Sequence, residues 1–458
     1  MLSRLAVWCD KLLEAGWLAA LIVVPLYFDI YSSRVFEPDK LSLLRSIAVL
    51  MAGVWIVRQI EGQRRATPPA NGNAAPSLAI AGKALAALRA NPLGLPTLMV
   101  VAAYLISTVF SLTIPVSVLG SYQRMQGTYS TFSYIVVFLV AASSLRTRAQ
   151  LDRVINTILA VAFPIALYGI LQHYQLDPLP WAGDVTLRVA SNMGNSIFVA
   201  AYLIMVAPLA FARWLETLAR WSAETGAASR ARTLSIGIAV AAAILSIVLW
   251  LLDVGLGAWF SILLFPLAYL LAPLMNARPR TSLLLATYTN VLSALVMTII
   301  FSQSRGPLVG LLSGMFLFVV LYALVRSARQ FMFGAIGLGA LGFGFIVLFN
   351  LPGSPLEPLR SLPYVGRLGN IFEVESASSS GTAKVRELIW QGDIPLILPH
   401  ETLWSPTSGD DPFNAIRPLV GYGPETMYVA YNRYYPPDLA HYESRNASPD
   451  RSHNETFD

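Results

Sequence analysis

Three arginines in short polar segments are the first residues whose types and spacing point to chemistry. They are Arg124 within residues 121–127, Arg188 just before the polar run 191–195, and Arg305 between Ser304 and Gly306. Arginine keeps its charge and pairs with phosphate oxygens through two parallel hydrogen bonds. Each of the three adjoins a long apolar run, so all are expected near a membrane surface. Such a set predicts a site for a lipid-linked diphosphate, whose tail would lie between the apolar segments.

Each arginine also has a plainer explanation. Arg124 can be an interfacial charge that extends to lipid head groups. Arg188, with polar residues up to Asn195 behind it, can belong to an ordinary capped helix start. Arg305 lies at the start of a predicted helix with Ser304 as its N-cap, at or within the bilayer edge. Arginines at that depth usually face a protein interior or a water-filled cavity, so the functional interpretation is favoured for Arg305.

The last residues of the chain supply a candidate base. His453 lies among acidic and polar residues, and a histidine beside carboxylates can take a proton from a hydroxyl group. Glu425, which follows a Gly-Tyr-Gly-Pro turn, is a second catalytic candidate. The alternatives are a solvated histidine, a plain loop turn, and a divalent-cation site made by Asp450, Glu455 and Asp458. No tight metal motif is present, and no metal ligand is assigned.

The composition indicates what must position these residues. The chain has 458 residues, of which 55% are hydrophobic and only 13% are charged, whereas soluble proteins carry about 25% charged residues. Repeated continuous apolar runs, each long enough to span a bilayer, predict an all-α polytopic membrane protein and argue against a β-barrel. The single cysteine, Cys9, excludes an intrachain disulfide. The net charge of +6 is expected in cytoplasmic loops, so no nucleic-acid partner is inferred.

Hydropathy predicts about eleven transmembrane spans. They are 17–31, 41–57, 95–112, 134–142 (beginning nearer Tyr129), 154–171, 197–214, 234–252, 256–274, 283–301, 308–325 and 331–351. Loops rich in Lys and Arg alternate with loops that hold few, and the basic set is expected in the cytoplasm together with the N-terminus. The three arginines and the C-terminal segment then fall on the external side.

The chain thus divides by polarity into a transmembrane helical domain, residues 1–351, and an external region, residues 352–458. A cytoplasmic linker is expected at about 59–93, with a flexible part at 66–77 and an amphipathic interfacial helix at 78–89. A short helix is expected at 382–391. The chain stops within the external region, and a further span is expected beyond residue 458.

Several short motifs, taken in order and on one side of the membrane, resemble those of the O-antigen ligase and polymerase superfamily, which includes protein O-oligosaccharyltransferases. The resemblance extends from about Arg124 to the end of the chain. Its motifs are Arg124-Met-Gln-Gly; Arg188 with Ser191, Asn195 and Ala200-Ala-Tyr-Leu; Ser304-Arg-Gly with Gly310; Arg386 with Ile389-Trp; Gly421-Tyr-Gly-Pro-Glu; and Asp450-Arg-Ser-His-Asn-Glu.

The resemblance implies a bacterial membrane glycosyltransferase with a GT-C-like fold, one more span than is counted here and a large external loop. It implies inverting transfer of a glycan from undecaprenyl diphosphate to a hydroxyl of a glycan, lipid or protein, outside the cytoplasmic membrane. His453 would activate the acceptor, while Arg188 and Arg305, with Arg124 as a third contact, would hold the diphosphate. No cofactor or metal is implied, because the donor is already activated.

A transporter or flippase of lipid-linked sugars is the alternative. It would also use external arginines around a membrane-embedded cavity. Transporters often contain an internal repeat and polar residues near the bilayer midplane. The chain shows no repeat, and its informative polar residues lie at the outer boundary. This pattern favours transfer over transport.

Overall fold

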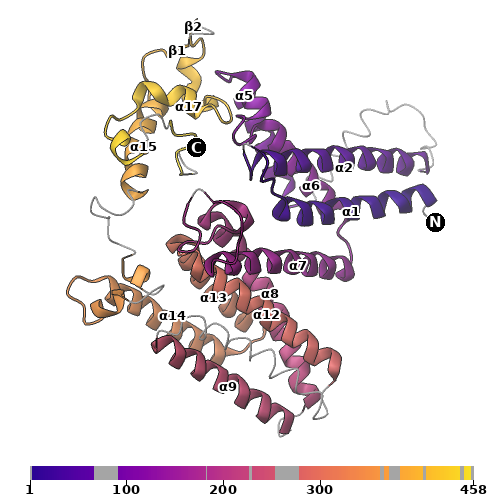
Figure 1. Cartoon of the computed structure of the whole chain (residues 1–458). Coiled ribbons are helices and arrows are strands. Elements are labelled where there is room, and N and C mark those ends of the chain that lie inside the picture. The colour runs from indigo at the N-terminus through magenta and orange to yellow at the C-terminus, as the bar shows by residue number, and fades with distance from the viewer. Residues whose placement is uncertain are drawn as a thin grey trace. The chain divides into compact units, whose positions relative to one another are not determined.

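The computed structural model describes residues 3–32, 34–65, 91–181, 183–225, 230–252, 278–361, 366–370, 382–405, 409–443 and 448–454. Within these residues the regular structure is almost entirely helical (Figure 1). The strands present there are β1 (Trp404–Ser405) and β2 (Gly409–Asp410), which pair antiparallel. The prediction of an all-α protein is confirmed for the described residues.

Every predicted span that falls in the described residues coincides with a helix. These helices are α1 (Arg4–Leu26), α2 (Pro38–Arg65), α4 (Gly94–Val109), α6 (Thr128–Ser144), α7 (Arg148–His173), α8 (Ser196–Thr225), α9 (Arg230–Leu251), α12 (Pro279–Phe301), α13 (Arg305–Val325) and α14 (Arg329–Asn350). The predicted span 256–274 and the predicted segments 66–77 and 78–89 lie outside the described residues.

Within the described residues, six helices are long and apolar enough to cross a membrane, namely those at 38–62, 148–173, 196–225, 279–301, 305–325 and 329–350. Shorter apolar helices occur at Gly94–Val109 and Thr128–Ser144. The chain is therefore a multi-pass helical membrane protein. The total of about eleven spans and the GT-C-like arrangement stay predictions.

Several helix boundaries differ from the predicted ones, most clearly the start of α1 and the end of α2. Helix α1 starts far ahead of the predicted residue 17, because the Ser3 hydroxyl caps it by accepting a 3.0 Å hydrogen bond from the Ala6 amide. Helix α2 continues through residues 59–65, which were assigned to the linker. This end of α2 is held against α1 by Arg58, whose Nε lies 2.7 Å from an Asp10 carboxylate oxygen.

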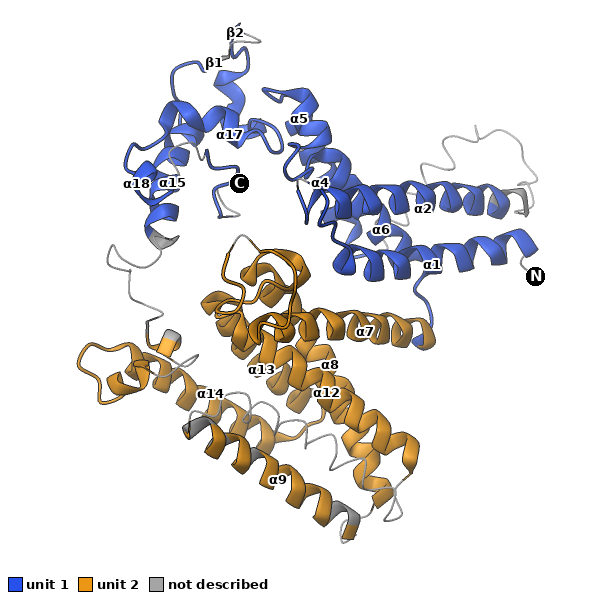
Figure 2. Cartoon of the chain, in the orientation of Figure 1, with its two compact units in different colours: residues 1–148, 374–458 blue, residues 149–373 orange. Residues whose placement is uncertain are grey.

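The chain forms two compact units (Figure 2). Unit 1 comprises Met1–Arg148 together with Val374–Asp458, and unit 2 comprises Ala149–Glu373. The C-terminal segment thus belongs with the first helices of the chain. This division is based on contacts between residues, whereas the predicted division at residue 351 is based on the polarity of the sequence. The location of residues 1–351 in the membrane and of residues 352–458 outside it stays a prediction.

In unit 1, α1, α2 and α6 pack against one another, and α4 and the short α5 (Ile114–Leu119) pack beside α6. Ala20, Leu41 and Leu44 form a buried cluster between α1 and α2. The Trp17 indole donates a 3.2 Å hydrogen bond to the Ser144 hydroxyl, which ties α1 to the end of α6. These helices form the base on which the C-terminal segment rests.

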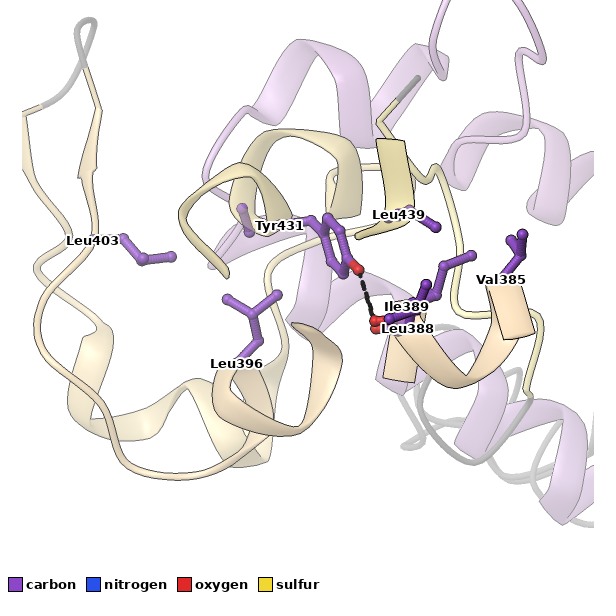
Figure 3. Close-up of a cluster of buried hydrophobic side chains, with 8 residues drawn as sticks. Val385, Leu388, Ile389, Leu396, Leu403, Tyr431 and Leu439 are labelled. Atoms are coloured by element: carbon purple, nitrogen blue, oxygen red, sulfur yellow. Dashed lines mark hydrogen bonds between the residues drawn. The ribbon is translucent and has the colours of Figure 1, made fainter. Parts of the chain in front are cut away.

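The C-terminal segment has a small hydrophobic core of its own (Figure 3). Helix α15 (Thr382–Ile397) supplies one side of this core, extending beyond the predicted helix 382–391. Tyr431 is fully buried against it, and its hydroxyl lies 3.3 Å from the Leu388 carbonyl and 3.2 Å from the Ile389 carbonyl. Further short helices are η5 (Asn414–Ile416), α16 (Arg417–Val420), α17 (Met427–Ala430), η6 (Tyr431–Tyr434) and α18 (Leu439–Tyr442). This core fixes the turns that carry the predicted site residues.

In unit 2, α8 packs against α12 and α13, and α13 packs against α14. Helix α7 approaches α12 closely at Gly169, where a Cβ atom would lie 2.7 Å from the Thr298 methyl group. The Thr298 hydroxyl donates a 2.7 Å hydrogen bond to the Ala166 carbonyl at the same crossing. Short 3-10 helices follow α14 at η3 (Glu357–Ser361) and η4 (Gly366–Asn370). The α7–α12 crossing sets the position of the loops that carry Arg188 and Arg305.

Candidate functional site

Arg124 lies in the tight loop 119–130, which joins α5 to α6. Gly120 has a φ of +87°, and a Cβ atom there would lie 2.5 Å from the Met125 backbone. A Cβ atom at Gly127 would lie 2.5 Å from the Gly120 amide nitrogen, so the two ends of the loop touch. The glycines thus permit a compact loop that presents Arg124 at its tip, where the side chain forms an ion pair with Asp450.

The predicted turn at Gly421-Tyr-Gly-Pro-Glu425 is confirmed, and it docks on this loop. Gly421, Gly423 and Glu425 all have positive φ values of 69°, 104° and 56°. The Tyr422 carbonyl accepts a 3.0 Å hydrogen bond from the Leu112 amide. One Glu425 carboxylate oxygen accepts a 2.5 Å hydrogen bond from the Ser121 amide, while its other oxygen is buried and has no hydrogen-bond partner in the described part of the chain. A buried, half-satisfied carboxylate is a recognised feature of functional sites.

Replacing Gly423 by alanine is expected to destabilise unit 1. The new Cβ atom would lie 2.4 Å from the hydroxyls of Ser111 and Ser117, and the residue would keep a left-handed φ. Backbone strain of this kind costs about 1–3 kcal/mol, before any displacement of the turn. Thermal unfolding of the purified chain in detergent measures the effect. Gly53→Ala is the matched control, because that helical glycine has open space around it; a Gly423→Ala midpoint equal to that of the control would contradict the prediction.

The segment that leads to His453 folds onto the same loop. Asp450 pairs with Arg124, and the Arg451 guanidinium donates a 2.7 Å hydrogen bond to the Gln126 side-chain oxygen. The Trp390 indole donates to the Ser452 carbonyl at 3.0 Å, which anchors the segment to α15. His453 follows with a φ of 56° and an exposed side chain. The structure therefore brings Arg124, Glu425 and the His453 segment to one place in unit 1.

Charges of both signs gather around Arg124. Burial raises the pKa of Glu37, against the opposing effect of the nearby Arg124 and Arg451 guanidinium groups. A Glu37 oxygen lies 4.0 Å from the Arg124 guanidinium. Of the acidic residues predicted beside His453, Asp450 is engaged by Arg124, while Glu455 and Asp458 lie outside the described residues. Within the described part of the chain, no group of three or more His, Cys, Asp or Glu side chains is placed to hold a metal ion.

Arg188 is carried in unit 2 by a loop that a buried polar cluster holds in place. Gln172 of α7 is fully buried, and its side-chain oxygen accepts hydrogen bonds from the amides of Ala190 and Ser191 at 3.1 and 2.7 Å.

Asp177 holds the first part of the same loop. It accepts hydrogen bonds from the Tyr168 hydroxyl at 2.8 Å and from the Trp181 indole at 2.7 Å. Burial acts to raise the pKa of Asp177, but its hydrogen bonds, first the one from the Leu179 amide and then those from Tyr168 and Trp181, outweigh burial and hold the pKa below its ordinary value. The loop is therefore fixed, while the Arg188 side chain is exposed.

The predicted helix start after Arg188 is confirmed. Helix α8 begins at Ser196, and the Asn195 side chain accepts a 2.8 Å hydrogen bond from the Ile197 amide. Arg305 is the first residue of α13, as predicted, and Ser304 occupies the N-cap position. The predicted capping by the Ser304 side chain is wrong, because its hydroxyl lies 3.3 Å from the Ser302 carbonyl within the preceding turn.

The loops of Arg188 and Arg305 are joined directly. The Val189 amide donates a 3.3 Å hydrogen bond to the carbonyl of Phe301, the last residue of α12 before the Arg305 turn. The His173 ring stacks on the Phe301 ring with centroids 3.8 Å apart, and one His173 nitrogen lies 2.8 Å from the Thr186 carbonyl. Unit 2 thus places its two predicted diphosphate ligands on adjoining loops. Since Arg124 belongs to unit 1, a clamp made by all three arginines stays a prediction.

Three residues that organise these loops are absent from the sequence-based set. Arg45, inside the apolar run of α2, holds the Arg124 loop; an arginine within a predicted span was itself a signal. Arg417 forms an ion pair with Asp411 behind the Gly-Tyr-Gly-Pro-Glu turn, with both side chains 1% exposed. Gln172 holds the Arg188 loop. Neither Gln172 nor Arg417 stands out by sequence, because each binds main-chain groups: the Ala190 and Ser191 amides for Gln172, and the Phe110 and Gly421 carbonyls for Arg417.

Comparison of the chain with protein-family models, with curated proteins and with solved structures gives no match.

Proposed function

We propose that this chain is a membrane glycosyltransferase of the O-antigen ligase and polymerase type. It takes a glycan from an undecaprenyl-diphosphate donor and transfers it to an acceptor hydroxyl on the outer side of the bacterial cytoplasmic membrane. The N-terminus lies in the cytoplasm, and the C-terminal segment lies outside. The acceptor is a sugar, lipid or protein hydroxyl.

The observation that carries the proposal is the meeting of two distant segments in unit 1. The turn with Glu425 and the segment with His453 both contact the loop of Arg124, through Ser121, Arg124 and Gln126. A base and a diphosphate ligand must lie close together for a displacement reaction. A polar tail with no role in chemistry has no need to converge on the loop that carries Arg124, whose side chain is 27% exposed.

The donor side of the proposed site uses arginines. When the glycan leaves, the bond between its anomeric carbon and the phosphate oxygen breaks, and the electron pair stays on the diphosphate. Guanidinium groups of Arg188, Arg305 and Arg124 would stabilise that charge as it develops. The proximity of the Arg188 loop to the Arg305 turn, through Val189 and Phe301, supports the first two acting together.

The acceptor side uses the C-terminal segment. The acceptor oxygen forms the new bond to the anomeric carbon from the face opposite the diphosphate, which inverts the configuration. His453 takes the proton of the acceptor hydroxyl. Glu425, one of whose carboxylate oxygens has no hydrogen-bond partner among the described residues, would orient the acceptor or accept a hydrogen bond from it. No step in this sequence requires an added cofactor.

The test is transfer by the full chain in lipid nanodiscs, supplied with a synthetic undecaprenyl-diphosphate glycan and a sugar acceptor in the presence of EDTA. Wild type is expected to release undecaprenyl diphosphate and form an inverted glycosidic bond. Arg188→Ala and Arg305→Ala are each expected to lower kcat/KM by about 10²–10³-fold, as is found when a donor to a developing oxyanion is removed.

Arg326→Ala is the matched control, because Arg326 lies at the opposite end of α13 from Arg305 and is exposed. The control should retain wild-type kinetics. Wild-type kinetics in both test variants would overturn the diphosphate clamp. Translocation of the donor across a vesicle membrane without formation of a glycosidic bond would overturn the proposal in favour of a transporter.

A further inference from the structure

Arg45 is a buried arginine whose contacts are all directed at one loop. It lies in the third turn of the apolar helix α2 and is 6% exposed. Its Nη2 atom donates to the Leu119 carbonyl at 2.6 Å and to the Met125 carbonyl at 2.7 Å. Its Nε atom donates to the Ser130 hydroxyl at 2.9 Å, and its guanidinium lies 4.7 Å from the Tyr129 ring centroid.

These acceptors lie at both ends and in the middle of the loop 119–130. Leu119 ends α5, Met125 follows Arg124 directly, and Ser130 lies in the first turn of α6. The Ser130 hydroxyl also donates to the Met125 carbonyl at 2.5 Å. Between the two carbonyls held by Arg45 lie Ser121, whose amide binds Glu425, and Arg124, which pairs with Asp450. One guanidinium therefore fixes the loop that meets both parts of the C-terminal segment.

The geometry requires an arginine. A guanidinium presents several N–H groups in a rigid fork, so that it reaches two carbonyls and a hydroxyl while lying flat near an aromatic ring. A lysine ammonium is a compact donor on a flexible stem and cannot reproduce this arrangement. A charged side chain within an apolar helix is unfavourable unless fully hydrogen-bonded, so its contacts are expected to be maintained.

We propose that Arg45 is a positioning residue: it acts through the loop 119–130 to place Arg124 against the donor diphosphate and the Ser121 amide against Glu425. The inference rests on the proposed function. Loss of the Arg45 guanidinium would let the loop 119–130 shift while leaving helix α2 intact. A misplacement of about 1 Å at a reacting centre lowers rates by about 10²-fold, so Arg45→Lys is expected to lower kcat/KM for transfer by that order.

The experiment compares the full chain in nanodiscs with its Arg45→Lys and Arg45→Met variants. Hydrogen exchange of peptides covering residues 119–130 is expected to become about tenfold faster or more in both variants, since the loop opens locally, while exchange in α1 stays unchanged. Arg58→Lys is the control, because Arg58 lies on the same helix and pairs with Asp10. It should leave both exchange of the loop and transfer unchanged.

A double-mutant cycle then tests whether Arg45 affects transfer through Arg124 and Glu425. In a background that carries both Arg124→Ala and Glu425→Ala, Arg45→Lys should lower transfer by about twofold at most, because both residues through which it acts are already lost. A full loss in that background, or unchanged loop exchange in Arg45→Lys, would overturn the positioning role. If loop exchange rises but wild type transfers no glycan, the positioning of the loop stands and the proposed function fails.

Discussion

His453→Ala is expected to slow glycan transfer by about 10²–10⁴-fold while leaving donor affinity unchanged. The loss falls on kcat, because the proton of the acceptor hydroxyl moves in the transition state and the donor is held by other residues. His453 is exposed and lies on the segment anchored by Asp450, Arg451 and Trp390, so its side chain is accessible to an acceptor. Initial rates at saturating donor, with donor binding measured separately, give the two quantities.

His441→Ala is the matched control, since His441 is an exposed histidine on α18 of the same segment. It should transfer at the wild-type rate. A wild-type rate in His453→Ala would show that the base is another group. Glu425→Gln then becomes the decisive variant: it retains the side-chain volume and the hydrogen-bonding oxygen but removes the negative charge.

Arg417→Met is expected to destabilise unit 1 by about 3–5 kcal/mol, because it leaves the carboxylate of Asp411 buried without its partner. The two side chains are joined by hydrogen bonds of 2.6 and 2.7 Å, and each is 1% exposed. Arg417 also donates to the carbonyls of Phe110 and Gly421 at 2.5 and 2.8 Å. It thereby links α4 to the turn that carries Glu425, and thermal unfolding of the purified chain should show a midpoint lower by about 10 °C.

The control is Arg433→Met. Arg433 pairs with Glu401 at 2.6 Å, but the two side chains are 41% and 87% exposed. A solvated pair of this kind contributes about 0–1 kcal/mol, so the midpoint should barely change. Equal effects of Arg417→Met and Arg433→Met would mean that burial does not decide the strength of the Asp411 pair.

The acid dependence of stability follows from the same ion pair. Burial acts to raise the pKa of Asp411, but hydrogen bonds from Arg417 and from the Phe413 amide outweigh it and hold the pKa below its ordinary value. The folded state therefore binds this proton less readily than the unfolded state. The stabilisation is present above the ordinary pKa of 3.8 and is lost as pH falls through the lower folded value.

The apolar runs predicted the helices well, because each run is continuous and a bilayer demands a hydrogen-bonded backbone. The start of α1 was missed, since its first turns are amphipathic and are helical through the Ser3 cap rather than through continuous apolarity. The capping role assigned to Ser304 failed for a local reason: the turn before it offers the Ser302 groups as competing partners.

The sequence predicted which residues belong to the candidate site, but not which residues they contact. The sequence indicates that Arg124, Glu425 and His453 carry chemistry, and unit 1 brings their segments together. The sequence places Asp450 beside His453, whereas the structure pairs Asp450 with Arg124. Partners such as Arg45 and the Leu119 carbonyl could not be found, since main-chain acceptors have no sequence signature and the path of the loop decides which of them converge.

Unit 1 is assembled from the two ends of the sequence, and this has a consequence for biosynthesis. The hydrogen bond from Ser121 to Glu425 joins residues 304 positions apart, and that from Arg451 to Gln126 joins residues 325 positions apart. At translation rates of about 5–20 residues per second, the loop 119–130 waits about 15–60 s for its partners to leave the ribosome. All helices of unit 2 are synthesised in that interval. The loop 119–130 must therefore remain open, and protected from non-native contacts, until Glu425 and Arg451 arrive to cover it.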